Sequence, residues 1–171
     1  NVRIDDNVQL KGKIDIKSYS HIARGCTLSG GNYGIFLDEF SSLANYVQIF
    51  TSSDDYYSPS IPVGSLNDKL RDKFSKLYLR RITIGKCCLV GSLSVLLPGT
   101  NLGDFASIGA LTVVNKKINK GIFFQSKSKE KQKKRDIKLF EKLYKNIKKI
   151  VKWKYINVET VIKKDFLIYF H

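Results

Sequence analysis

The side chains whose types best suit proton transfer are His21 and two carboxylates that follow one another in the chain, Asp54 and Asp55. An unperturbed imidazole titrates close to neutral pH, which makes His21 a candidate general base. The chain contains only two histidines, and the other, His171, is its last residue. Asp54 or Asp55 could orient the imidazole as the third member of a triad does. The alternative is a solvated histidine together with two acids that begin a turn.

The elements that must position these side chains follow from a six-residue repeat. Between positions 84 and 114 aliphatic residues recur without a miss, at Ile84, Val90, Leu96, Leu102, Ile108 and Val114. Small residues stand four places after the first five of them, at Cys88, Ser94, Thr100, Ala106 and Thr112. A helix would drift off one face, and a plain strand would mark every second residue. The repeat therefore predicts a parallel β-helix in which each hexapeptide forms one side of a triangular coil.

The same repeat begins at the start of the chain. Its aliphatic residues there are Ile4, Leu10, Ile16, Ile22 and Leu28, and later Leu37, Leu43 and Ile49. Between Leu28 and Leu37 the run Gly-Gly-Asn-Tyr-Gly shifts the repeat by three residues, which we interpret as a bulge at a corner. About fourteen hexapeptides predict four to five coils, with the aliphatic residues inside. We expect glycines 85, 91, 103 and 109 to relax the backbone near the turns. The alternative fold, a sandwich, would need turn clusters between its strands.

The repeat stops at Asp54 and returns by Ile82. The segment between them, about residues 54–80, is polar, broken by prolines and too long for a turn, so we expect a loop that protrudes from one corner. Such a loop is often functional, because the scaffold fixes its base while its tip reaches a ligand. The alternative is a tolerated surface insertion.

Positive charge is concentrated at the end of the chain. Residues 115–171 hold 18 Lys and Arg against 5 Asp and Glu, which leaves 12 against 10 for residues 1–114. From Lys131 to about Lys154 the apolar spacing predicts an α-helix whose opposite face is nearly all lysine. This helix packs on its own assembly or rests on an anionic membrane surface. We therefore expect a β-helix domain over 1–115 and an exit loop with a basic helical extension over 116–171.

Three cysteines, an odd count without metal-ligand spacing, favour a reduced cytoplasmic compartment. The basic helix leaves the inner face of the membrane as an alternative location. No apolar run approaches the roughly 18 residues needed to span a bilayer, and no secretory signal is visible. The chain lacks Met and Ile4 is already in register, so we expect the natural N-terminus to be missing.

Residues 84–114, with Leu-Pro-Gly at 97–99 as their most characteristic landmark, resemble the C-terminal coils of hexapeptide-repeat acyltransferases. Within that superfamily the chain looks most like the sugar O-acetyltransferases of bacterial surface-polysaccharide pathways, over roughly residues 2–129. The resemblance implies a left-handed parallel β-helix, a homotrimer and acyl transfer from acetyl-coenzyme A, with no metal. The handedness rests on the resemblance alone.

The resemblance also points to site residues. Related enzymes place a catalytic His in a Thr-x-x-His setting at the mouth of the loop, where this chain reads Thr51-Ser52-Ser53-Asp54. His21, at the sixth, outward corner position of its hexapeptide, is then the candidate base. Asp54 lies on a different corner, so we expect Asp54 or Asp55 to reach His21 from a neighbouring subunit. A carboxylate acting alone, or late loss of the acceptor's proton, is the other possibility.

For the coenzyme, motif positions carry over to Ser92, Ala110, Lys116 and Lys129. Glycines beside the first two would let the pantetheine arm approach the backbone, and the lysines could meet phosphate as point charges. Of the motif that usually surrounds the second lysine, only Lys129 itself survives.

Acetyl transfer to a sugar hydroxyl in capsule, O-antigen or exopolysaccharide synthesis is the function that the sequence favours. The alternatives are N-acetylation of an amino sugar nucleotide and a β-helix scaffold without activity. A β-helix carbonic anhydrase is excluded, because its zinc needs three histidines and the predicted domain has one. Nucleic-acid binding by the basic tail is not favoured, because no recognition module surrounds it.

Overall fold

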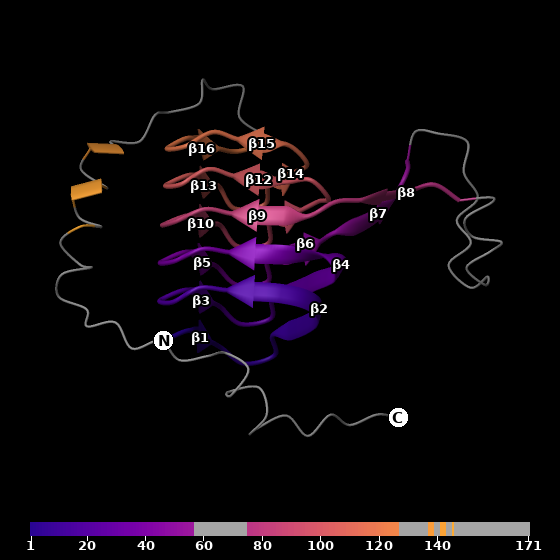
Figure 1. Cartoon of the computed structure of the whole chain (residues 1–171), viewed down its shortest axis with the longest axis horizontal. Helices are drawn as coiled ribbons and strands as arrows, with labels where there is room; N and C mark the ends of the chain where they lie inside the picture. The colour runs from indigo at the N-terminus through magenta and orange to yellow at the C-terminus, as the bar shows by residue number, and fades with distance from the viewer. Residues whose placement is uncertain (57–74, 127–136, 139–140, 143–144, 146–171) are drawn as a thin grey trace. The chain divides into compact units, whose positions relative to one another are not determined.

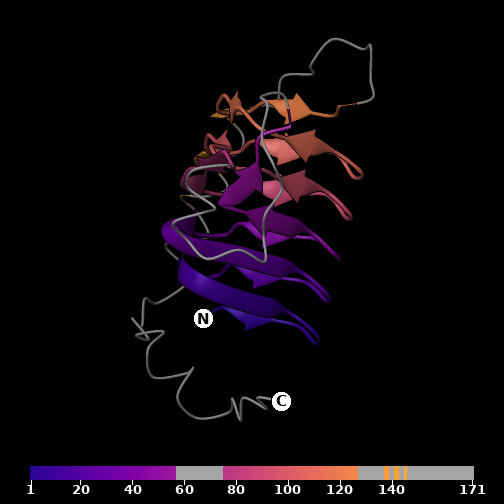
Figure 2. The same ribbon diagram turned by 90° about the vertical axis from the view of Figure 1, so that its right-hand side faces the viewer.

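A computed structural model describes residues 1–56, 75–126, 137–138, 141–142 and 145. The coils lie within one compact unit, Val2–Arg135. Within the described residues the chain forms sixteen strands, and all of them except β7 and β8 stack as the rungs of a parallel β-helix, as Figures 1 and 2 show. This confirms the predicted all-β coil.

The coils have three faces, each a parallel ladder. Face 1 consists of β1 (Arg3–Ile4), β3 (His21–Ile22), β5 (Ser42–Leu43), β10 (Leu89–Val90), β13 (Ser107–Ile108) and β16 (Phe123–Phe124). Face 2 consists of the first halves of β2 (Gln9–Ile16) and β4 (Thr27–Leu37), followed by β6 (Gln48–Phe50), β11 (Val95–Leu96) and β14 (Val113–Val114). Face 3 consists of the second halves of β2 and β4, followed by β9 (Ile82–Ile84), β12 (Asn101–Leu102) and β15 (Lys117–Ile118). The chain visits the faces in this order in every coil, so corresponding residues of neighbouring coils lie side by side.

The interior is the column of aliphatic residues that the repeat predicts. Ile22, Leu28, Leu37, Leu43, Ile49, Ile84, Val90, Leu96, Leu102 and Val114 are all buried in one core cluster. Each burial removes a large aliphatic side chain from water, which is worth roughly 1.5–3 kcal/mol. The six-residue spacing is therefore explained by one inward-pointing side chain on each face.

The small residues at the fifth places have a second role besides filling space. The Ser41 hydroxyl donates to the carbonyl of Gly85 at 2.6 Å, and the Thr100 hydroxyl donates to the carbonyl of Val114 at 2.8 Å. Ser94 donates in the same way to Gly109 at 2.9 Å. These buried hydroxyls join neighbouring coils, so they are satisfied polar groups, which avoids the cost of an unpaired one.

The corners correct one expectation about glycine. The left-handed backbone conformation occurs at the fourth place of the hexapeptides, where it is mostly held by other residues, namely Asn7, Tyr19, Phe40, Tyr46, Cys87, Leu93, Phe105 and Leu111. Gly91 does not have a positive φ; instead, a Cβ on it would lie 2.5 Å from the backbone nitrogen of Ala110 in the next coil. Glycine is needed there for the close approach of two coils, not for a turn.

The predicted three-residue shift is confirmed in the pairing of β2 with β4. Leu10 pairs with Leu28 and Ile16 with Leu37, so β4 carries three residues more than β2 over this stretch. The register changes around Gly12, which pairs with Gly31, so β4 passes the corner as one continuous strand.

The C-terminal end of the β-helix differs in detail from the predicted boundary. β15 and β16 continue the coil past the predicted boundary at Asn115 as far as Phe124, because Ile118 and Phe124 resume the inward positions after a shortened corner. β7 (Ser52–Asp54) and β8 (Leu77–Leu79) pair antiparallel and form the stem of the predicted loop, whose tip lies outside the described residues. Most of the predicted helix, with its proposed membrane contact, also lies outside them. Among the residues that are described, no helix is long and apolar enough to cross a membrane.

Candidate functional site

His21 is held by a carboxylate of its own chain. Its Nε2 lies 3.0 Å from Oδ2 of Asp5, and Nε of Arg3 donates to the other carboxylate oxygen at 2.8 Å. The side chains of His21 and Asp5 are 33% and 25% exposed. His21 is the first residue of β3 on face 1, so it points outward as predicted but from a strand and not from a corner. The three side chains form a network at the surface of the first two coils, in which Arg3 is exposed and the other two are partly buried.

The register of the coils explains why Asp5 meets His21. Arg3 pairs with His21 across β1 and β3, and Asp5 follows two places later on the same side of the chain. Subtracting the 18 residues of one coil from position 21 gives Arg3, and Asp5 lies two places further on, so the coil register could have predicted this contact from the sequence. The hydrogen bond from His21, and then that from Arg3, lowers the pKa of Asp5 below its usual value.

Asp54 and Asp55 lie at the loop stem. Asp54 is exposed at the end of β7, and the backbone N–H of Asp55 donates to the carbonyl of Lys76 at 2.9 Å. The stem leaves the corner between face 2 and face 3. Because Asp5 already holds the imidazole, orientation of His21 does not require either of these acids from a neighbouring subunit.

Three of the four residues expected to contact coenzyme A border face 2. Ser92 and Ala110 lie in adjacent coils at the corner between face 1 and face 2, where Leu111 N–H donates to the Ser92 carbonyl at 2.9 Å. Lys116 lies at the opposite edge of this face, between β14 and β15, with its Nζ 4.5 Å from the centre of the Phe124 ring. Lys129 lies outside the described residues. The structure thus brings Ser92 and Ala110 together and places Lys116 across face 2 from them.

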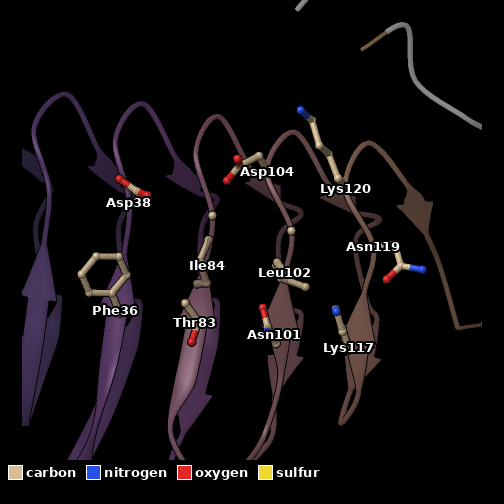
Figure 3. Close-up of a pocket in the computed structure, with 12 residues that line it drawn as sticks. Phe36, Asp38, Thr83, Ile84, Asn101, Leu102, Asp104, Lys117, Asn119 and Lys120 are labelled. Atoms are coloured by element: carbon tan, nitrogen blue, oxygen red, sulfur yellow. The ribbon is translucent and has the colours of Figure 1, made fainter. Parts of the chain in front are cut away.

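A groove that sequence reasoning missed lies on face 3, with a volume of about 570 Å³ (Figure 3). Its strand side carries Phe36, Thr83, Asn101 and Lys117, and its corner side carries Asp38, Asp104, Asn119 and Lys120. The residues on the strand side occupy paired places of successive coils. They are scattered along the chain and form no local motif, so only the coil register could have revealed them.

Two glycines, Gly85 and Gly103, are among the residues that line the groove. A Cβ on Gly85 would lie 2.6 Å from a carboxylate oxygen of Asp104, and one on Gly103 would lie 2.6 Å from the backbone nitrogen of Lys120. Glycine at these two places therefore lets neighbouring coils approach closely beneath the groove. The walls are set by hydrogen bonds: Asp104 accepts from the backbone N–H of Lys86 at 3.0 Å, and Asp38 from that of Glu39 at 2.7 Å.

Known acyltransferases resemble this chain in sequence and in fold. A dTDP-4-amino-4,6-dideoxy-D-glucose acyltransferase from Escherichia coli is 32% identical over 117 residues, 67% of this chain, and the match spans only 58% of that relative's length. AntD, an N-acyltransferase from Bacillus cereus in complex with dTDP and 3-hydroxybutyryl-CoA, has a TM-score of 0.78 at 25% identity, covering 88% of this chain and 78% of that one. A point mutant of AntD with dTDP-4-amino-4,6-dideoxyglucose and coenzyme A has a TM-score of 0.74 at 27% identity, covering 87% and 78%. In sequence and in fold the chain is thus similar to sugar acyltransferases, and its coil is consistent with the hexapeptide-repeat acyltransferase superfamily.

No protein-family model matches this chain. Its parallel coil matches the left-handed β-helix that the resemblance implies. The AntD complexes hold coenzyme A or 3-hydroxybutyryl-CoA together with a dTDP compound, so an enzyme of that kind needs two ligand sites. In the described part of the chain no three His, Cys, Asp or Glu side chains gather as a metal site.

Proposed function

We propose that this chain is a coenzyme A-dependent acyltransferase that acylates the amine of a dTDP-linked 4-amino-4,6-dideoxy sugar. The observation that carries the proposal is its similarity to the E. coli acyltransferase of that sugar nucleotide, at 32% identity. The AntD complex with the same sugar nucleotide and coenzyme A supports it. The N-acylation that the sequence left as an alternative thus becomes the preferred reaction.

The side chain at the loop mouth also favours an amine acceptor. In the reaction the amine nitrogen attacks the thioester carbonyl, a C–N bond forms, the C–S bond breaks, and the proton lost by nitrogen balances the thiolate of coenzyme A. A neutral amine has a lone pair and needs no base at the moment of attack, whereas a hydroxyl must be deprotonated. Asp54 in place of the expected His is therefore a smaller defect for N-acylation than for O-acetylation.

The donor is proposed to lie along face 2. Ser92 and Ala110 would contact the pantetheine arm at one edge, and Lys116 would meet phosphate at the other. Lys129 remains a proposed second phosphate contact. His21, held by Asp5 at 3.0 Å, remains the proposed proton acceptor. The alternative proton acceptor is the carboxylate of Asp54 or Asp55 at the loop stem.

A homotrimer is part of this proposal. Leu93, Leu111 and Val113 are 54%, 58% and 51% exposed on face 2 and its corner with face 1. Apolar side chains gathered in this way are typical of an interface, and we propose that a second copy of the chain covers them. The proposed location is the cytoplasm, which rests on the cysteine pattern.

Acyl transfer tests the function directly. The enzyme is mixed with acetyl-coenzyme A and dTDP-4-amino-4,6-dideoxyglucose, and free thiol and the mass of the sugar nucleotide are measured. We expect thiol release matched by one added acetyl group. The matched control is the sugar nucleotide with a hydroxyl at carbon 4: preferential acetylation of that compound would favour O-acetylation, and no thiol release with either would favour a scaffold.

A further inference from the structure

The groove on face 3 has the dimensions and chemistry of a second ligand site. Its volume of about 570 Å³ lies within the range of small-molecule sites. It extends over four rungs, from β4 through β9 and β12 to β15, which is about 14 Å at the ~4.8 Å strand spacing. The donor residues border face 2 instead, so the groove is free for another ligand.

We propose that this groove binds the sugar nucleotide acceptor, with the diphosphate at Lys117 and Lys120 and the amino sugar between Phe36 and Asp38. The inference rests on the proposed function and adds to it the residues that select the acceptor.

The end of the groove at β15 is basic. Lys117 and Lys120 line it together with the amide of Asn119. Lys120 Nζ lies 5.2 Å from the centre of the Phe105 ring, a contact that places its charge at the corner side. Lysine side chains bind phosphate as point charges, and amide N–H groups donate to its oxygens. A diphosphate therefore fits this end best.

The opposite end pairs an aromatic ring with a carboxylate. Phe36 lies in β4 and Asp38 directly follows the last residue of that strand, and both side chains line the groove. Lys17 Nζ and the Arg81 guanidinium lie 5.4 Å and 5.6 Å from the Phe36 ring centre, which holds the ring as a wall. Asp38 is held through its bond from the N–H of Glu39.

These two side chains match two neighbouring substituents of the acceptor. A 4-amino-4,6-dideoxy sugar carries an amine at carbon 4 and a methyl group on the adjacent carbon 5. The Asp38 carboxylate can accept from the amine, and the Phe36 ring can cover the methyl group. Thr83 and Asn101 lie between the two ends and can bond to sugar hydroxyls or phosphate.

The level of this end also suits the reaction. The loop stem enters face 3 through β8 and β9, so Asp54 leaves the corner between face 2 and face 3 on the coil next to that of Phe36. Asp38 lies across face 3 from it, at the corner with face 1. A donor along face 2 and an acceptor along face 3 border the same corner. The amine end of the acceptor would then lie at the level of the loop, and both phosphate ends at the level of β14 to β16.

Calorimetric binding of three probes, dTDP, dTDP-4-amino-4,6-dideoxyglucose and coenzyme A, tests the assignment with two neighbouring lysines as matched variants. We expect Lys117→Ala to weaken both dTDP probes about tenfold, the loss of one charged hydrogen bond, and to leave coenzyme A unchanged. Lys116→Ala should instead weaken the binding of coenzyme A and leave the binding of both dTDP probes unchanged. Asp38→Asn and Phe36→Ala should weaken the amino sugar nucleotide severalfold while dTDP alone binds as before.

The outcomes separate the two proposals. If the wild-type enzyme acylates the amine but Lys117→Ala and Asp38→Asn bind both dTDP probes normally, the groove assignment is wrong and the function stands. If the wild-type enzyme binds coenzyme A but neither dTDP probe, the proposed function fails as well. If Lys117→Ala weakens coenzyme A instead, the groove belongs to the donor and the assignment is overturned.

Discussion

Face 2 and face 3 are built from the same repeat but present opposite chemistry to the outside. Leu96 on face 2 and Leu102 on face 3 both point into the core. On the outside, face 2 and its corner carry exposed Leu93 and Val113, whereas face 3 carries Asn101 and Lys117 around a groove. The inward positions are constrained by packing, so the outward positions alone are free to differ, and there we expect function to be encoded.

The largest effect on stability should come from truncating a buried side chain of face 2. Leu96→Ala removes a fully buried side chain from the core, and we expect the free energy of unfolding to fall by about 2–5 kcal/mol. The neighbouring Val95→Ala, on the outside of the same strand, should cost less than about 1 kcal/mol. Denaturant unfolding of both variants measures the contrast. Equal losses would show that the assignment of inside and outside is wrong.

Placing charges on the outer surface of face 2 should change the oligomeric state and leave folding unchanged. Two charges in the double variant Leu93→Lys, Leu111→Lys would have to be buried at the proposed subunit interface, which is costly. We expect a homotrimer to become a monomer, measured by light scattering after size exclusion, with an unchanged circular dichroism spectrum. Asn32→Lys, at an exposed position of β4, serves as the control. A double variant that stays a trimer would place the interface elsewhere.

Turnover should distinguish the two candidate proton acceptors. If His21 takes the proton, His21→Ala should lower kcat about a hundredfold, the range of general-base catalysis, and Asp5→Asn should lower it less. Asp54→Asn should then have little effect. A large loss with Asp54→Asn and normal turnover with His21→Ala would move the chemistry to the loop stem.

The smallest effect concerns the Asp5 carboxylate and pH. Its pKa is lowered in the folded chain by His21 and Arg3, so its ionised form stabilises the fold above the unfolded pKa. This stabilisation is lost as the pH falls through the lowered pKa of the folded state. We expect wild type to exceed Asp5→Asn in stability at neutral pH and to lose that margin in strong acid. A margin that grows with acidification would contradict the pairing.

The sequence predicted what the repeat controls and missed what depends on register between coils. Ile84, Val90, Leu96 and their equivalents predicted the core, because each stands six residues from the next. The Asp5–His21 contact and the groove at Thr83 and Asn101 join residues one coil apart, and no local motif marks them. The glycine prediction failed because period alone does not separate a turn from the close approach of two coils.

A crystal structure with coenzyme A and dTDP-4-amino-4,6-dideoxyglucose bound together tests the division between the two faces most directly. We predict coenzyme A along face 2, against Ser92 and Ala110, and the sugar nucleotide in the groove of face 3, with its diphosphate at Lys117. A sugar nucleotide bound elsewhere, with the groove on face 3 covered by another subunit, would contradict the account.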